Sequence, residues 1–267
     1  MKQSIQIPKK VNKIHVPTNG NSLLGKAIDN INNNQEIATL WRIINVNAVD
    51  RLGMSDHGPI HFQIVANIAV KFLRMLIDSD VEMSITKDYK LSSHHAELVV
   101  FFASVLHDLG MTINRKDHEM FSLFLANNLL HQMVDFLPVE EKTIVISEIL
   151  HAIISHRSDG RPLTLEAGIV RVADALDMSE GRSRIVYQQE KLDIYSVSAA
   201  AIDKVNIKKG TVKPIQIDIL LNNSAGIFQL DELLKNKIVG SGIEKYLDVH
   251  AYINQKTEKG LIKEYRI

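Results

Sequence analysis

The feature that most constrains the fold is an apolar run over residues 98–105 that ends in the adjacent pair His107-Asp108. Such a run predicts a buried helix, and we expect Gly110 to close it as a C-cap. A buried helix rarely carries two neighbouring titratable groups without a partner, because an unpaired buried charge is costly. A metal ion is one good partner, since it pairs with an ionised carboxylate and a neutral imidazole together. The pair therefore indicates a metal site, provided that other His and Asp residues converge on it.

The composition narrows the chemistry. The chain has 267 residues, 45% of them apolar, so a sizeable core is available and wholesale disorder is excluded. It contains no Cys, which excludes disulfides, thiolate ligands and Cys nucleophiles. The 31 Lys and Arg residues balance 31 Asp and Glu residues, which gives no sign of nucleic-acid or membrane-surface binding. We identify no apolar run that approaches a membrane span and no signal core, so we expect a cytoplasmic protein.

Two periodicities divide the chain. A helical period in the first part predicts helices, with a polar loop at 79–93. After Tyr187 the residues alternate as strands do, around one further helix. We therefore predict a mainly α helical bundle with an N-terminal arm over residues 1–190, followed by a small α+β C-terminal module over residues 191–267. The expected helices are 23–33, 36–52, 59–78, 94–106, 118–133, 139–156, one from 164, and 229–237. The expected strands are 205–207, 214–220, 246–253 and 261–265.

Histidines and aspartates supply candidate partners for the pair. Eleven His residues are many for this length, and nine of them fall between His57 and His156. Several lie close to predicted helix ends, where a bundle can bring them together in its core. The set is larger than one metal needs and suffices for two metals bridged by one carboxylate. The candidate ligands are His57, His61, His107, Asp108, His118, His151, His156 and Asp174.

These segments carry a family resemblance. His61 with Val65-Ala66 after it, the pair His107-Asp108 and the run Val172-Ala173-Asp174 resemble the ordered H…HD…D signature of the HD-domain metal-dependent phosphohydrolase superfamily. The spacing and the helical context fit over residues 50–185. The later histidines are similar to the extra histidines of its binuclear branch, which includes cyclic-dinucleotide phosphodiesterases and nucleotide phosphohydrolases.

The resemblance implies an assignment of ligands to two divalent ions, with Mn, Fe, Co, Ni, Zn and Mg as candidates. One ion would be held by His61, His107, Asp108 and Asp174. Asp108 would bridge to the second ion, which His118, His151 and His156 would complete. His57 lies four residues before His61, so it could reach a further ion or the substrate. His151 and His156 do not share a helix face, so both can bind only if His156 lies beyond the helix end.

The implied chemistry is attack of a metal-activated hydroxide on a nucleotide-like phosphoester, with Asp108 at the centre of the site. Asp177 or Glu119 would orient a ligand histidine or move a proton. Met111 stands where the phosphodiesterase branch usually has a Lys, so other cations are expected to bind the phosphate. The candidates are Arg115, Arg157, Arg182 and Arg184. Monoester, diester and triphosphate chemistry all stay open.

Other functions and partners are also open. A nucleotide-sensing regulatory protein would keep the metal site without efficient turnover, and a structural protein would keep only a vestigial site, which the intact ligand set disfavours. The expected partners are a phosphorylated small molecule or nucleotide and a second copy of the chain in a homodimer, with no nucleic acid and no membrane. The C-terminal module shows no catalytic cluster and is interpreted as a dimerisation or packing unit, with a small-ligand regulatory module as the alternative.

Overall fold

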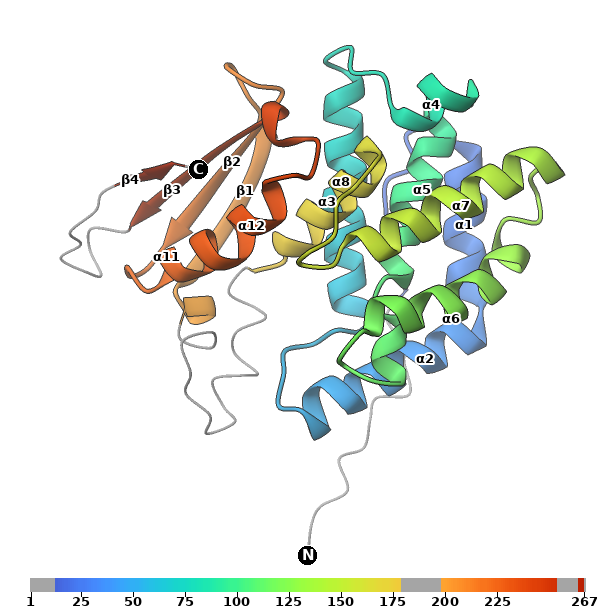
Figure 1. Cartoon of the computed structure of the whole chain (residues 1–267), viewed down its shortest axis with the longest axis horizontal. Coiled ribbons are helices and arrows are strands. Elements are labelled where there is room, and N and C mark those ends of the chain that lie inside the picture. Colours follow the sequence, from blue (N-terminus) through green and yellow to red (C-terminus); the bar gives the residue numbers. More distant parts are fainter. Residues whose placement is uncertain (1–12, 179–197, 254–263, 267) are drawn as a thin grey trace, which may run out of the picture.

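The structure is a helical bundle with a four-stranded sheet beside it (Figure 1). It is a computed structural model that describes residues 13–178, residues 198–253 and the backbone of residues 264–266. The predicted mainly α body followed by a small α+β module is confirmed. The predicted boundary at residue 190 lies outside the described residues, as do Arg182 and Arg184.

The bundle is built from helices that succeed one another along the first part of the chain. In chain order they are α1 (Ser22–Asn33), α2 (Gln35–Asn45), the π-helix η1 (Val46–Arg51), α3 (Pro59–Ile77), α4 (Ser84–Tyr89), α5 (Ser93–Leu106), the 3₁₀-helix η2 (Leu109–Thr112), α6 (His118–Met133), α7 (Val139–Ser155) and α8 (Leu165–Ala175).

Helix α5 is the central element of the bundle. It packs against α1, α3, α7 and α8, and all of its residues from His95 to Leu106 are buried. A helix that is enclosed on every side has no solvent-facing polar face, which explains why α5 is mostly apolar from Leu98 to Leu106 rather than amphipathic. Its end is therefore in the interior, and His107 and Asp108 begin their loop inside the protein.

The one acidic residue within α5, Glu97, joins three helices. Its Oε1 accepts a hydrogen bond from Arg74 Nε of α3 at 2.7 Å, and its Oε2 accepts one from Asn21 Nδ2 at 2.8 Å. Asn21 is also the N-cap of α1, where its Oδ1 accepts the backbone N–H groups of Leu23 and Leu24. The buried charge of Glu97 is thus paired, as the cost of burying a carboxylate requires.

The structure corrects the loop expected at 79–93, because α4 lies within it. Ile85 is buried, and its backbone N–H donates to Glu166 Oε1 of α8 at 3.0 Å. Ser84 Oγ accepts the backbone N–H of Leu165 at 2.9 Å. A six-residue helix is not stable by local propensity alone, so these contacts with α8 stabilise it and the local sequence gave no signal.

Gly110 is not the C-cap that we expected. Helix α5 already ends at Leu106, with His107 in the cap position, and Gly110 lies within η2. Its role is a close approach: a Cβ at this position would lie 1.9 Å from the backbone oxygen of His118. Glycine therefore lets the turn after the His-Asp pair contact the first turn of α6 directly.

The expectation that no segment approaches a membrane span needs correction at α3. This helix of 19 residues is long and apolar enough to cross a membrane by composition. In the structure it packs against α5 and α8, with Phe62, Val65 and Phe72 fully buried. Its apolar composition is accounted for by its place in the core, and it carries His61 in its first turn.

The C-terminal module contains a sheet with the order β1-β2-β3-β4. Its strands are β1 (Ile202–Lys209), β2 (Ile215–Leu221), β3 (Leu247–Ile253) and β4 (Glu264–Arg266). The outer pairs are antiparallel, whereas β2 and β3 are parallel. Parallel neighbours require a crossover, which consists of α11 (Gly226–Phe228), the π-helix η3 (Gln229–Leu234) and α12 (Lys235–Ile238), before the 3₁₀-helix η4 (Glu244–Tyr246).

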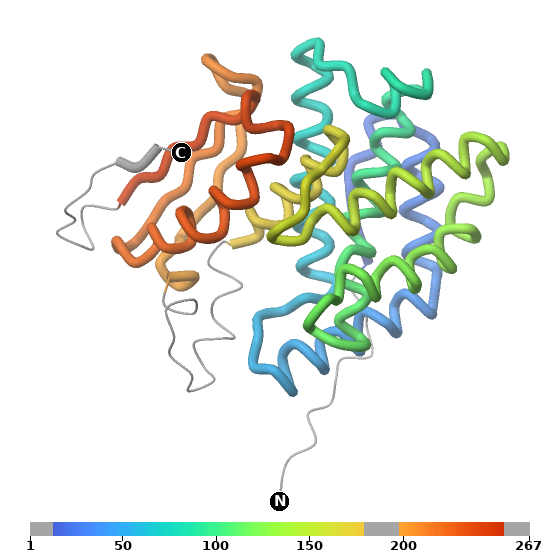
Figure 2. The backbone as a smooth tube through the Cα atoms, viewed as in Figure 1, coloured from blue at the N-terminus to red at the C-terminus, as the bar shows by residue number. Residues whose placement is uncertain are grey.

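Helix α8 joins the module to the bundle. It packs against α3, α5 and α7 on one side and against α12 and η3 on the other. Figure 2 shows α8, in yellow, between the helices of the bundle and the orange and red chain of the module. Residues of α8 can therefore contact both parts of the protein.

The buried acidic residues Glu148 and Glu166 give a pH-dependent prediction. Burial, and then the charge of Glu166, raise the pKa of Glu148 above its ordinary value. A raised carboxyl pKa stabilises the fold fully below the unfolded-state pKa of about 4.3, and that stability is lost as pH rises through the folded pKa. Glu148→Gln removes the charge, so its melting temperature should exceed that of the wild type at pH 7 by about 2–4 °C and equal it near pH 4.

Thermal unfolding followed by circular dichroism at the two pH values measures this difference. Glu140→Gln is a matched control. Glu140 is exposed in the first turn of the same helix, where its charge stabilises the helix N-terminus slightly. The Glu140→Gln protein should therefore not melt above the wild type. A Glu148→Gln protein that melts below the wild type at pH 7 would contradict the prediction.

Candidate metal centre

Five helices bring a titratable side chain to one place in the bundle. His61 lies in the first turn of α3, His107 caps the end of α5, and His118 begins α6. His156 caps the end of α7, and Asp174 lies in the last turn of α8. Helix ends suit this purpose, because several can converge on one point without displacing the packed middle of the bundle.

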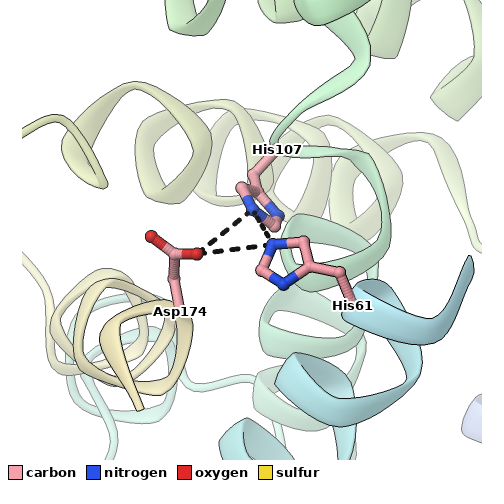
Figure 3. Close-up of side chains that lie close together, drawn as sticks. All are labelled: His61, His107 and Asp174. Carbon is pink, nitrogen blue, oxygen red and sulfur yellow. Dashed lines mark hydrogen bonds and ion pairs between the residues drawn. The ribbon is translucent and has the colours of Figure 1, made fainter. Parts of the chain in front are cut away.

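The first group consists of His61, His107, Asp108 and Asp174. Figure 3 shows His61, His107 and Asp174 pointing toward one another from three separate helix segments. The Nε2 atoms of His61 and His107 are 3.1 Å apart, and they lie 3.4 and 3.6 Å from Asp174 Oδ1. Asp108 Oδ2 lies 3.7 Å from His61 Nε2 and 3.5 Å from His107 Nε2. The ligand atoms of His61, His107 and Asp174 lie within 4.8 Å of one another, so these three residues could hold one cation.

The second group lies on the other side of Asp108. Asp108 Oδ1 is 3.0 Å from His118 Nε2 and 3.8 Å from His156 Nε2. Glu119 is close as well, with Oε2 3.3 Å from His118 Nδ1. The two oxygens of Asp108 thus face different pairs of histidines, and this is the geometry of a carboxylate that could bridge two ions.

Each of the four histidines in these groups is oriented through its Nδ1 atom. His107 Nδ1 lies 2.9 Å from the Ser104 carbonyl oxygen, and His156 Nδ1 lies 2.6 Å from that of Ile153. The corresponding contacts are Arg115 O at 3.0 Å for His118 and Asp177 Oδ2 at 2.7 Å for His61. An Nδ1–H that donates to these oxygens leaves the Nε2 lone pair free to bind a metal.

This arrangement fits a cation for a physical reason. With Nδ1 protonated on both rings, the Nε2 atoms of His61 and His107 present lone pairs to each other across 3.1 Å. Two facing lone pairs repel, and so do a lone pair and the carboxylate of Asp108 that faces it. A proton or a metal ion between them removes the repulsion, so the residues present fit a divalent metal.

The charges of the site agree with that fit. Burial disfavours an imidazolium ion, but Asp108 and Asp174 outweigh burial and raise the pKa of His107 to about 9. Burial alone would raise the pKa of Asp108, whereas His107 and His118 hold it well below its ordinary value. Burial, followed by the charge of His107, lowers the pKa of His156. The interior is therefore built around two ionised carboxylates that need positive charge.

The structure brings two further predicted residues to the edge of these groups. Asp177 contacts His61 Nδ1, which is the orienting position expected for Asp177 or Glu119. The His57 ring lies beside that of His61, with centroids 5.7 Å apart and the planes tilted by 50°, and its Nδ1 lies 2.7 Å from the Ser55 carbonyl oxygen. His57 is adjacent to the candidate ligands and belongs to neither the first nor the second group.

His151 is a predicted ligand that lies apart from both groups. Its Nε2 accepts the backbone N–H of Leu163 at 3.0 Å, and the Ser155 hydroxyl lies beside the ring. Five residues on, His156 lies past the end of α7 and faces Asp108 instead. The separation of about 140° around a helix puts the two rings in different places, so His151 supports the loop between α7 and α8.

The predicted phosphate-binding arginines within the described chain lie together. Arg115 and Arg157, with Lys116, line a hollow next to His118 and Glu119. Arg115 Nη1 is also 3.0 Å from His118 Nδ1, and Arg157 pairs with the exposed Asp159. These cations lie beside the second group, where they can attract an anion.

Two basic residues near the site were missed by sequence reasoning. Arg171 is buried on α8, and its guanidinium donates to backbone carbonyls of the α7–α8 loop and of α12. Lys237 of α12 lies 3.5 Å from Asp174 Oδ2. Arg171 gave a weak signal, as an arginine within the apolar run of α8. Lys237 gave none, because its proximity to Asp174 is a property of tertiary structure alone.

The fold and the site together define a class, a helical protein with a histidine and aspartate metal site at converging helix ends. Residues 60–179 match the HD domain family, and this range contains His61, His107, Asp108 and Asp174. The chain belongs to the HD domain family, whose superfamily consists typically of metal-dependent hydrolases.

A second comparison extends the similarity to most of the chain. An uncharacterized protein of Methanocaldococcus jannaschii is 42% identical over 240 residues, which cover 90% of this chain and 92% of that protein. The C-terminal module is therefore largely shared with this relative. No solved structure matches the chain.

The contact between Asp177 and His61 predicts an effect on metal affinity. Asp177→Asn keeps an acceptor near His61 Nδ1 but removes the charge that makes the ring a better ligand. Metal affinity should fall about 10- to 100-fold, as is usual when a carboxylate behind a ligand histidine is lost. Calorimetric titration with Mn²⁺ measures it. Asp29→Asn, at an exposed position on α1, should leave the affinity unchanged, and equal affinities for all three proteins would refute the orienting role.

The close approach at Gly110 predicts a structural effect. Gly110→Ala places a Cβ against the His118 carbonyl oxygen and the Ser122 nitrogen, so the first turn of α6 must move. The free energy of unfolding should fall by about 1–3 kcal/mol, and the metal content should decrease because His118 moves with α6. In contrast, Gly25→Ala meets nothing closer than 4.0 Å within α1 and should stabilise by about 0.5–1 kcal/mol. Urea unfolding measures the stability of both variants, and metal analysis measures their metal content. A Gly110→Ala protein as stable as the wild type would contradict the prediction.

Proposed function

We propose that this protein is a metal-dependent phosphohydrolase that hydrolyses a nucleotide-like phosphoester with two divalent ions bound. The observation that carries the proposal is the position of Asp108, whose two oxygens face two different pairs of histidines. One metal needs only one of these pairs. A carboxylate between two ligand groups supports a binuclear centre. Members of this superfamily are typically metal-dependent hydrolases, which supports hydrolysis as the reaction.

The ligands divide between two ions. His61, His107 and Asp174 would hold the first, and His118 and His156 the second, with Asp108 shared by both. Glu119 is near enough to His118 and His156 to join the second ion or to receive a proton. The imidazole and carboxylate donors accept Mn, Fe, Co, Ni or Zn as readily as Mg.

When bound, the ions would generate hydroxide near neutral pH and polarise the phosphoryl oxygens. The protein's own residues carry out the remaining tasks. Asp177 holds the His61 ring in its ligand orientation, and the burial of Asp108 keeps bulk water away from its two oxygens. Arg115 and Arg157 can bind a phosphate or a second anionic group in the hollow next to His118.

The first test combines metal analysis with a substrate screen. Protein purified without chelators should contain about two ions per chain. It should hydrolyse a member of a panel of cyclic dinucleotides, nucleoside mono- and triphosphates and an aryl phosphate, with Mn²⁺ or Mg²⁺ present. Asp108→Ala should lose metal and about 10³-fold or more of this activity, whereas Asp29→Ala should lose neither.

Each other result has a clear meaning. One ion or none per chain would exclude the binuclear centre. Turnover that survives in Asp108→Ala would exclude the site. Tight nucleotide binding without turnover would favour a nucleotide-sensing regulatory protein. A homodimer in the cytoplasm stays part of the proposal, and sedimentation of the purified protein tests the dimer.

A further inference from the structure

Lys237 is a basic residue of the C-terminal module that reaches the candidate metal centre. Its Nζ lies 3.5 Å from Asp174 Oδ2, and it also donates to the backbone carbonyl of His156. The lysine side chain is 18% exposed, so it is held against the site and is still open to a ligand. Among the described residues, no other Lys or Arg forms an ion pair with Asp108 or Asp174.

Arg171 fixes the position of Lys237. Its guanidinium donates to the carbonyl oxygens of Lys237 and Asn236, both at 3.0 Å. The same group donates to the carbonyls of Ser155 and Ser158 at the end of α7. Arg171 is 2% exposed and lies on α8 one turn before Asp174, so α12 is held at a defined distance from a candidate ligand.

The two oxygens of Asp174 separate the ligand side from the lysine side. Oδ1 faces the Nε2 atoms of His61 and His107, whereas Oδ2 faces Lys237. An anion that binds at the first group, next to Asp174, would therefore also contact the ammonium group of Lys237. Arg115 and Arg157 lie beside the second group, so positive charge borders both halves of the centre.

We propose that Lys237 binds the phosphoryl group of the substrate, and that the C-terminal module is thus a part of the active site. The inference rests on the proposed function, since it assigns the cation for the same phosphoester. It also gives the module a role in binding, beyond the packing or dimerisation expected from the sequence. A compact ammonium group suits a phosphoryl oxygen as a point charge and needs no planar partner.

The chain offers a matched set of variants. Lys237→Gln keeps a donor for the His156 carbonyl and removes the charge, whereas Lys237→Arg keeps the charge. Lys235→Gln is the control, because Lys235 lies on the same short helix, is 48% exposed and pairs with Asp231 away from the site. The probe is inorganic phosphate, titrated calorimetrically into the full-length Mn²⁺-loaded protein, with metal content and melting temperature measured for each variant.

The expected result is a dissociation constant for phosphate that rises about 10- to 100-fold in Lys237→Gln, with the metal content unchanged. Lys237→Arg should retain most of the affinity, and Lys235→Gln should match the wild type. Phosphate affinity equal to wild type in Lys237→Gln would overturn the proposal. So would a loss of affinity that only follows a loss of metal, because Lys237 would then act by positioning Asp174.

A measurement on the wild type covers the case in which Lys237→Gln does not fold. Acetylation of lysines, followed by mass spectrometry, should be slowed by phosphate at Lys237 and not at Lys235. Equal rates with and without phosphate would overturn the proposal.

The results separate this inference from the proposed function. Turnover by the wild type with no effect at Lys237 refutes only the role of Lys237. Phosphate bound through Lys237, with no phosphoester hydrolysed, refutes the proposed hydrolysis and leaves the phosphate site in place.

Discussion

The structure depends on the negative charge of two aspartates near the middle of a helical bundle. Asp108 is almost fully buried, and the facing histidines keep it ionised. A carboxylate in that position needs positive charge close to both of its oxygens, because burial in a low-dielectric interior is otherwise costly. Four histidines, each oriented through its Nδ1 atom, supply the donors that a cation requires there. The helix ends around Asp108 are arranged to satisfy this one electrostatic requirement.

The packing of the bundle serves the same requirement. Because α5 is enclosed on all sides, its C-terminal end can deliver His107 and Asp108 into the interior. Gly110 then allows the chain to turn against α6 so closely that His118 reaches Asp108. The Ser122 hydroxyl joins the same elements, since it donates to the His107 carbonyl and accepts the Gly110 N–H. Close packing next to the ligands limits their motion, and this favours a preorganised site.

Helix α8 connects the helical bundle to the C-terminal module through Asp174 and Arg171, which lie one turn apart. Asp174 faces the histidines, and Arg171, one turn earlier, holds both the α7–α8 loop and the end of α12. A movement of the module would therefore change the surroundings of Asp174. The similarity to the relative from Methanocaldococcus jannaschii covers 90% of this chain, so it includes residues of both parts.

The sequence by itself determined the order of most helices and strands, because helical and alternating periods are local properties of the chain. It also indicated His61, His107, Asp108 and Asp174, through residue types near predicted helix ends or on apolar helices and through the resemblance to the HD-domain signature. Only the tertiary structure decided that α4 forms and that Gly110 allows the backbone to approach α6 closely. It also decided that His151 binds the backbone of the α7–α8 loop instead of facing Asp108. It alone placed Lys237 beside Asp174, 63 residues away in the chain. The reason is physical: contacts between distant segments depend on the angles and distances at which whole helices pack, and no local pattern records them.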